Sequence, residues 1–267
     1  MFVCAEGALE VPPALEVGGR RLRTRVLPSG RFFVAAGRGP ILPSAFRGRR
    51  RPVQAGYSLG TSKTVGTAGL LTAPAQGPFR AQVLTACHVV SRALKVHGIP
   101  VLQPAGPDGG LLPEDGIGKI TSVLAPARRG TSVSDAALVE LAPGVAFDAA
   151  YPGFGPLRGH CAVVRLGWTV YKAGRSTGLI SGRILSTDWS GFVDYAGGRC
   201  WFTGQLLIEG LPGPAALPGD SGSVWVTDSG YAVALSFSAT DRKGRYSIAT
   251  PIHRVLEAFD ARVITLW

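Results

Sequence analysis

The sequence predicts an all-β protein. Its 267 residues include 37 glycines and 20 prolines, only 17% are charged, and the mean hydropathy is +0.21. That composition is typical of compact, turn-rich proteins and not of disordered chains. Short runs of Val, Ile, Leu and aromatic residues recur between glycines and prolines, as at residues 31–34, 162–166 and 231–235, which indicates many short strands. A chain of this length buries a sizeable core, and all-β architectures of this size often form one domain.

One helix is expected near the C-terminus. Ile252, Val255, Leu256 and Phe259 recur at the spacing i, i+3, i+4, i+7 after Pro251, as in a helix that packs one apolar face on a core. We expect this helix to be scaffold. No apolar run approaches the ~18 residues of a membrane-spanning helix, so no membrane partner is expected.

The most informative motif surrounds Ser221. Residues 217–223 read Leu-Pro-Gly-Asp-Ser-Gly-Ser and lead into the apolar run 224–226. A serine hydroxyl is a poor nucleophile unless a base removes its proton and donors stabilise the oxyanion it creates. The glycines permit a tight turn, so the N–H groups of Gly219 and Ser221 can point at one spot beside the hydroxyl. The alternative interpretation is a polar hairpin turn, because Gly, Asp and Ser are common in turns.

A catalytic serine also needs a histidine base and a carboxylate that orients it. His88 stands within residues 83–90, at the end of an apolar, β-prone run, and Asp135 immediately precedes the small, apolar strand expected at 136–141. The alternatives are a core histidine bonded to a carbonyl and an ordinary aspartate at the start of a strand. The other histidines lie in Gly-flanked loops or at the start of the expected helix: His97, His160 and His253.

Three motifs in the order His, Asp, Ser resemble the trypsin/chymotrypsin-like serine peptidases. Among these, the bacterial trypsin-like peptidases are the most similar. They are residues 85–88 (Thr-Ala-Cys-His), 135–138 (Asp-Ala-Ala-Leu) and 219–223 (Gly-Asp-Ser-Gly-Ser). Subtilisins and α/β-hydrolases carry the same three residue types in other orders.

Further similarity concerns the barrels of that family. Residues 172–182 resemble the strand pair that opens the second barrel, and residues 51–58 with 66–69 resemble the start of the first. The resemblance implies two six-stranded antiparallel Greek-key barrels with a C-terminal helix. It predicts a first barrel with His and Asp over 51–155 and a second barrel with Ser and the helix over 156–267. Residues 1–50, which the resemblance does not cover, are expected to form a basic N-terminal segment packed on the barrels.

The resemblance also implies a hydrolase, a serine endopeptidase that acts on a protein or peptide substrate. Ser221 would be the nucleophile, His88 the base and Asp135 its orienting partner, with the amides of Gly219 and Ser221 as the oxyanion hole. No metal ion or organic cofactor is required. A catalytically silent binding module on the same fold remains an alternative.

Walls for a specificity pocket are expected from Ala215 before the nucleophile and from Ser236, Phe237 and Ser238 after it. Ala215 falls where trypsin-like relatives carry an acid that binds basic side chains. An alanine there argues against a preference for Lys or Arg, and Phe237 would narrow the pocket. We therefore expect cleavage after a small or apolar residue.

The sequence departs from processed relatives at Asp220. In those relatives the aspartate before the nucleophile pairs with a newly cut amino terminus, but no activation site precedes the first barrel here. The partner of Asp220, and whether the oxyanion hole forms without a trigger, stay open. We expect either one dedicated protein substrate or an activating protein partner.

Charge is concentrated at the start of the chain. Residues 1–51 hold ten arginines against three glutamates, within a net charge of +11. The Arg-rich cluster at 47–51 could bind nucleic-acid phosphates or an acidic protein surface. Phe46 is its only aromatic neighbour, so base stacking has little support. We expect a solvated basic arm; a nucleic-acid-binding β protein is the remaining alternative.

The four cysteines form no CxxC pair. Residues 1–15 contain Glu6 and Glu10, lack Lys and Arg, and do not resemble a secretory signal peptide. We therefore expect a cytoplasmic protein with free thiols. Zinc between residues 87–88 and 160–161 is not expected, because structural zinc sites use other ligand spacings. The cysteines are Cys4, Cys87, Cys161 and Cys200.

Overall fold

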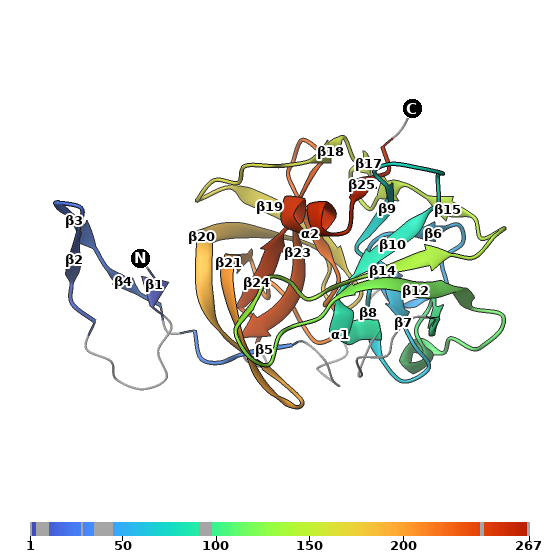
Figure 1. Ribbon diagram of the computed structural model, residues 1–267, viewed down its shortest axis with the longest axis horizontal. Helices are drawn as coiled ribbons and strands as arrows, with labels where there is room; N and C mark the ends of the chain where they lie inside the picture. Colours follow the sequence, from blue (N-terminus) through green and yellow to red (C-terminus); the bar gives the residue numbers. More distant parts are fainter. Residues whose placement is uncertain are drawn as a thin grey trace.

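The computed structural model describes residues 2–3, 11–27, 29–34, 45–90, 98–240 and 243–265. His97 and Cys4 lie outside them. Strands dominate, and the α-helices of the described part are α1 (Cys87–Val90) and α2 (Ile252–Ala258) (Figure 1). The predicted all-β class and the C-terminal helix are confirmed, with Ile252, Val255 and Leu256 of α2 buried. No helix of the described residues is long and apolar enough to cross a membrane.

The first sheet brings together the segments that carry His88 and Asp135. Its eight strands follow the order β25-β9-β10-β14-β12-β11-β7-β8. Neighbours β10 and β14 are antiparallel, with Thr85 opposite Ala137, so the residues that follow β10 meet those that precede β14. The strands are β7 (Ser58–Gly60), β8 (Val65–Thr67), β9 (Leu70–Pro74), β10 (Gln82–Thr85), β11 (Pro100–Leu102), β12 (Gly116–Leu124), β14 (Ala136–Leu141) and β25 (Ala261–Val263).

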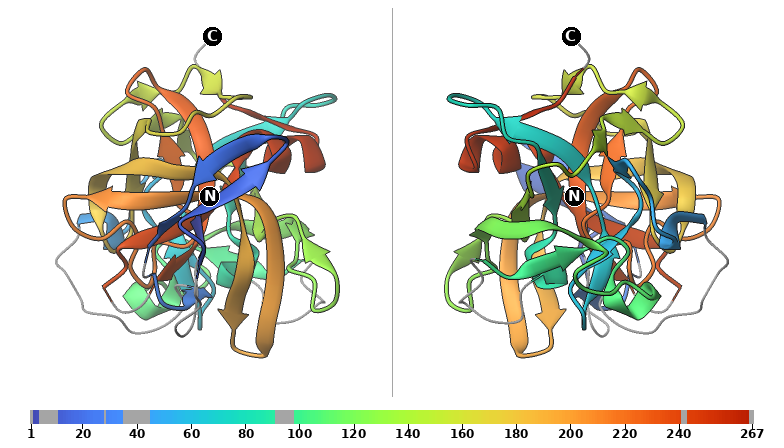
Figure 2. Two further views of the ribbon diagram at one scale, coloured as in Figure 1. Left: turned by 90° about the vertical axis from the view of Figure 1, so that its left-hand side faces the viewer. Right: turned by 90° about the vertical axis from the view of Figure 1, so that its right-hand side faces the viewer.

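The second sheet closes into a six-stranded antiparallel barrel. The strands pair in the order β21-β24-β23-β22-β19-β20, and β20 returns to β21. Trp225 and Ile184 fill its interior. Figure 2 shows the long hairpin of β20 and β21 extending beyond the barrel. The strands are β19 (Thr169–Gly174), β20 (Gly178–Tyr195), β21 (Gly198–Leu211), β22 (Val224–Val226), β23 (Tyr231–Thr240) and β24 (Tyr246–Pro251). The two-barrel fold that the sequence implied is confirmed.

Short elements connect and flank the barrels. Two 3-10 turns lie before and within the first barrel, and several two-residue strands pair in the loops. They are η1 (Ala45–Arg47), η2 (Gly106–Asp108), β6 (Val53–Gln54), β13 (Thr131–Ser132), β15 (Phe147–Asp148), β16 (Ala150–Tyr151), β17 (Gly155–Pro156) and β18 (Gly159–His160).

The N-terminal residues divide into separate structures. A hairpin of β2 (Ala14–Val17) and β3 (Arg20–Arg23) stands away from the barrels, with β1 (Phe2–Val3) and β4 (Arg25–Val26) beside it (Figure 1). In contrast, β5 (Phe32–Val34) joins the second sheet, where it pairs with both β20 and β23.

The Arg-rich cluster is not a free arm. The Arg49 guanidinium lies 2.9 Å from Asp115, and Arg51 donates to the Gln103 side chain at 2.5 Å. These contacts hold residues 49–51 against the first barrel. The guanidinium groups of Arg49 and Arg51 thus have polar partners within the fold.

Candidate active site

The sheet register brings His88 and Asp135 together, and the two residues make two contacts. His88 lies in α1, directly after β10, and Asp135 directly precedes β14. His88 Nδ1 is 2.6 Å from Asp135 Oδ2, and the His88 backbone N–H donates to Oδ1 at 3.0 Å. Asp135 is fully buried. The carboxylate therefore fixes both the position and the orientation of the imidazole, as a general base requires.

Tyr195, which sequence reasoning missed, completes the surroundings of Asp135. Its hydroxyl donates to Asp135 Oδ2 at 2.8 Å from the end of β20. Burial and the neighbouring carboxylate raise the pKa of Tyr195 well above its usual range, so it stays a donor at neutral pH. No local pattern links residues 60 positions apart; only the pairing within the second barrel brings Tyr195 here.

Cys87, beside His88, is not a competing nucleophile. Burial, with a smaller effect of Asp135, raises the pKa of its thiol to about 12. Because the thiolate is the reactive form, Cys87 is inert at neutral pH. Cys161 and Cys200 are also free thiols, and no disulfide joins the three.

Glycines place the Ser221 loop against the His88 turn. Gly222 has φ +93°, and a Cβ there would lie 2.2 Å from Thr85 Oγ1 and 3.1 Å from Ala86 N. A Cβ at Gly66 would meet both the Val89 side chain at 2.3 Å and the Ser221 carbonyl at 2.7 Å. Only glycine permits these approaches, which bring the candidate nucleophile alongside the candidate base.

Ser221 and His88 do not share a hydrogen bond in this structure. Ser221 Oγ donates to the Phe237 carbonyl at 3.3 Å, and His88 Nε2 is buried without a partner among the described residues. Nucleophile–base contacts are often long or misaligned before substrate binds.

The backbone of the Ser221 loop presents two amides. The Pro218 carbonyl accepts from Ser176 Oγ at 2.6 Å, so the opposite end of that peptide, the Gly219 N–H, points away from Ser176. Within the described part of the chain, neither the Gly219 nor the Ser221 N–H donates to a backbone carbonyl. Both donors are therefore free for an oxyanion.

Asp220 has a side-chain partner, which answers the question left open by the sequence. Its Oδ2 is 3.2 Å from Lys172 Nζ, and both side chains are 0% exposed. The carboxylate also accepts the backbone N–H groups of Ser176 at 2.8 Å, Thr177 at 3.1 Å and Leu217 at 2.9 Å. Burial lowers the pKa of Lys172, and Asp220 opposes that shift. A lysine of β19 thus anchors the Ser221 loop.

The expected pocket residues lie in two places. Ser236, Phe237 and Ser238 are buried on β23, where the Phe237 carbonyl contacts Ser221 and its ring packs 4.8 Å from Phe202. Ala215 is buried in the apolar cluster inside the second barrel, with Trp225 among its members. The selectivity that we inferred from these residues stays a prediction.

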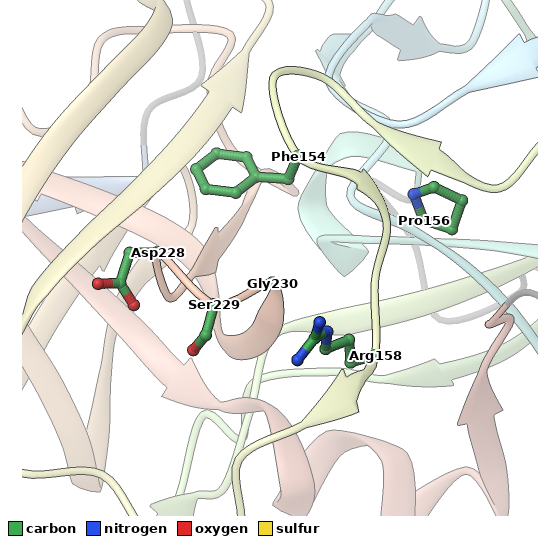
Figure 3. Close-up of a pocket in the computed structure, with 6 residues that line it drawn as sticks. All are labelled: Phe154, Pro156, Arg158, Asp228, Ser229 and Gly230. Atoms are coloured by element: carbon green, nitrogen blue, oxygen red, sulfur yellow. The ribbon is translucent and has the colours of Figure 1, made fainter.

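The remaining candidates do not join the site. His160 lies in β18 and His253 in α2, and the described residues hold no group of three or more His, Cys, Asp or Glu side chains suited to a metal ion. A pocket of about 370 Å³, drawn in Figure 3, has none of His88, Asp135 and Ser221 in its lining. It is lined by Phe154, Pro156, Arg158, Asp228, Ser229 and Gly230.

Solved structures share this architecture. Thermobifida fusca Protease A aligns with a TM-score of 0.59 and 20% identity, covering 80% of this chain and 99% of its own. Cellulomonas bogoriensis chymotrypsin gives a TM-score of 0.54 and 21% identity, over 80% and 99%. A glutamic-acid-specific serine protease gives 0.58 and 16%, over 79% and 100%.

At these identities the likeness establishes the fold. No protein-family model and no curated protein sequence matches the chain. The protein therefore has the chymotrypsin-like fold of bacterial serine proteases.

Proposed function

We propose that the protein is a serine endopeptidase that hydrolyses peptide bonds through an acyl-enzyme. The observation that carries this proposal is the assembly of three distant segments at one place. The buried Asp135 holds His88, and the Ser221 loop lies against the same turn. Among the described residues, the N–H groups of Gly219 and Ser221 donate to no backbone carbonyl. A turn with only a structural role would not require this set of groups.

The first half of the reaction uses each of these groups. Ser221 Oγ attacks the peptide carbonyl while His88 Nε2 takes its proton, forming the C–O bond. The amides of Gly219 and Ser221 hold the oxyanion, and such a donor contributes roughly 3–4 kcal/mol to lowering the barrier. The C–N bond then breaks as His88 returns the proton to the leaving amine.

Water completes the cycle. It attacks the ester carbonyl, gives one proton to His88, and Ser221 leaves with that proton as the acid product departs. Asp135 and Tyr195 act through His88: the carboxylate stabilises the imidazolium, and the Tyr195 hydroxyl shares the carboxylate's charge.

For the substrate we propose one dedicated protein, or general cleavage under the control of an activating protein. Two features of the sequence support a preference for small or apolar residues before the cut bond: an alanine, Ala215, at the position where trypsin-like relatives carry an acid, and Phe237 after the nucleophile. A positional-scanning peptide library tests this preference, and strong cleavage after Arg would contradict it. Broad, constitutive digestion of casein by the purified chain would contradict a dedicated substrate.

Reaction with a fluorophosphonate tests the chemistry, because this reagent modifies only an activated serine. We expect one phosphonyl group per chain on Ser221, absent in Ser221→Ala and strongly slowed in His88→Ala. Ser229→Ala, in a surface turn, is the matched control and should react like the wild type. A silent module would react no faster than its Ser221→Ala variant.

A further inference from the structure

Strand β5 of the N-terminal segment lies between β20 and β23, beside the candidate active site. It pairs antiparallel with the end of β23, with Val34 opposite Ser238 and Phe32 opposite Thr240. Its other edge pairs parallel with β20, where Phe32 is opposite Val193. A strand from outside the second barrel is therefore hydrogen-bonded on both sides, between the extended hairpin and β23 (Figure 1).

Both neighbours of β5 lead to the triad. On β23 the residue before Ser238 is Phe237, whose carbonyl contacts Ser221 Oγ. On β20 the residue after Asp194 is Tyr195, which bonds Asp135 and lies 6.1 Å from the His88 ring. From Phe32 to Val34, β5 runs toward Phe237 along β23 and toward Tyr195 along β20. The direction of its backbone therefore leads to Ser221.

The contacts of β5 are those of a bound peptide. The Phe33 carbonyl accepts from Ser238 Oγ at 2.9 Å. Phe32 is 3% exposed and its ring packs edge-on against Trp189 at 5.1 Å, whereas Phe33 is 41% exposed. Peptides that add a strand to a sheet bind in this way: the backbone supplies affinity, and alternate side chains enter pockets.

The nucleophile itself has almost no access to solvent. Ser221 is 1% exposed, and the Nε2 atom of His88 is buried. A peptidase that attacks a bound carbonyl needs an open channel at this place. In this structure β5 already occupies the place beside the end of β23 along which a substrate would reach Ser221.

We propose that β5 occupies the channel in which an extended peptide substrate binds, so that the N-terminal segment is a ligand of its own active site. Substrate must displace β5, and it binds best with an aromatic residue where Phe32 now contacts Trp189. This inference rests on the proposed function, because it assigns the substrate channel of that site. A strand of three residues on a connecting segment is suited to exchange, since local opening of such elements takes little free energy.

Peptide binding tests the channel without catalysis. The full chain with Ser221→Ala is titrated with a fluorescein-labelled peptide Ser-Gly-Arg-Phe-Phe-Val, the sequence of residues 29–34. We expect at least 10-fold tighter binding when Phe32→Asp is added, because the competing strand is then released. Phe33→Asp, on the exposed side of β5, is the matched control and should bind like the parent. Equal binding to all three proteins would overturn the proposal.

Covalent reaction tests the same channel in the active chain. A diphenyl phosphonate that carries a four-residue peptide, Phe-Phe-Val-Ala, should modify Phe32→Asp at least 10-fold faster than the wild type or Phe33→Asp. Phe32→Ala, a milder change, should act in the same direction. Equal rates with the peptidyl reagent, while the small fluorophosphonate labels every protein, would refute the channel and leave the peptidase intact. Failure of the small reagent with every variant would refute the peptidase, and the binding titration would still decide the role of β5.

Discussion

The buried pair of Lys172 and Asp220 makes a sharp prediction about the Ser221 loop. Lys172→Met keeps most of the side-chain volume and removes the Nζ that lies 3.2 Å from Asp220 Oδ2, where neither side chain is exposed. Removing one partner of a buried pair costs about 3–5 kcal/mol because a charge is left unpaired. Three backbone N–H donors remain on Asp220, so we expect a loss near the lower value.

Urea unfolding measures that loss, and fluorophosphonate labelling measures its effect on the loop. Asp220 bonds Leu217 within the segment that presents Gly219, so a disturbed carboxylate should also slow labelling of Ser221. Lys119→Met is the matched control: it changes an exposed lysine on β12, and it should alter stability by less than about 0.5 kcal/mol. If Lys172→Met behaves like this control in both assays, the lysine does not anchor the loop.

Three further predictions concern Tyr195, Gly219 and Cys87. Tyr195→Phe removes the donor to Asp135, which should cost about 1.5–3 kcal/mol of unfolding free energy. Because the folded pKa of Tyr195 is raised, the wild type should lose stability more steeply than this variant as pH rises above about 10. Gly219→Ala, at φ +100° with neighbours 2.6 and 2.8 Å from the new Cβ, should slow labelling about 100-fold; Gly213→Ala, with open space around it, should not. Iodoacetamide at pH 8 should leave Cys87 unmodified in the folded chain by peptide mapping, because its pKa is about 12; modification at the rate of a free thiol would contradict its burial.

Local sequence motifs located the nucleophile, base and acid candidates because each is defined by its immediate neighbours. Ser221 is marked by the glycines around it, and Asp135 by the apolar strand that follows it. The order of these motifs along the chain also indicated the fold, which the structure confirms. Such signals are readable because tight turns and buried strands restrict composition within a few residues.

The sequence does not predict contacts between residues that only the tertiary structure brings together. Lys172 looks like any lysine of a strand until the barrel places it against Asp220. Tyr195 reaches Asp135 only through the extended hairpin. The position of β5 was missed for the same reason: three residues in an Arg-rich segment gave no sign that they would pair with strands some 160 to 210 positions later. The excess of arginine there indicates a charged surface, whereas the contact that Phe32 makes with Trp189 is between two aromatic rings.

Digestion of a peptide library, with new termini identified by mass spectrometry, tests the proposed peptidase most directly. The wild type and Phe32→Asp are compared with Ser221→Ala. We expect new termini that need Ser221, after small or apolar residues, and formed faster by Phe32→Asp. The absence of new termini with both active-serine proteins, or the same termini with Ser221→Ala, would contradict the assignment of Ser221 as the nucleophile of a peptidase.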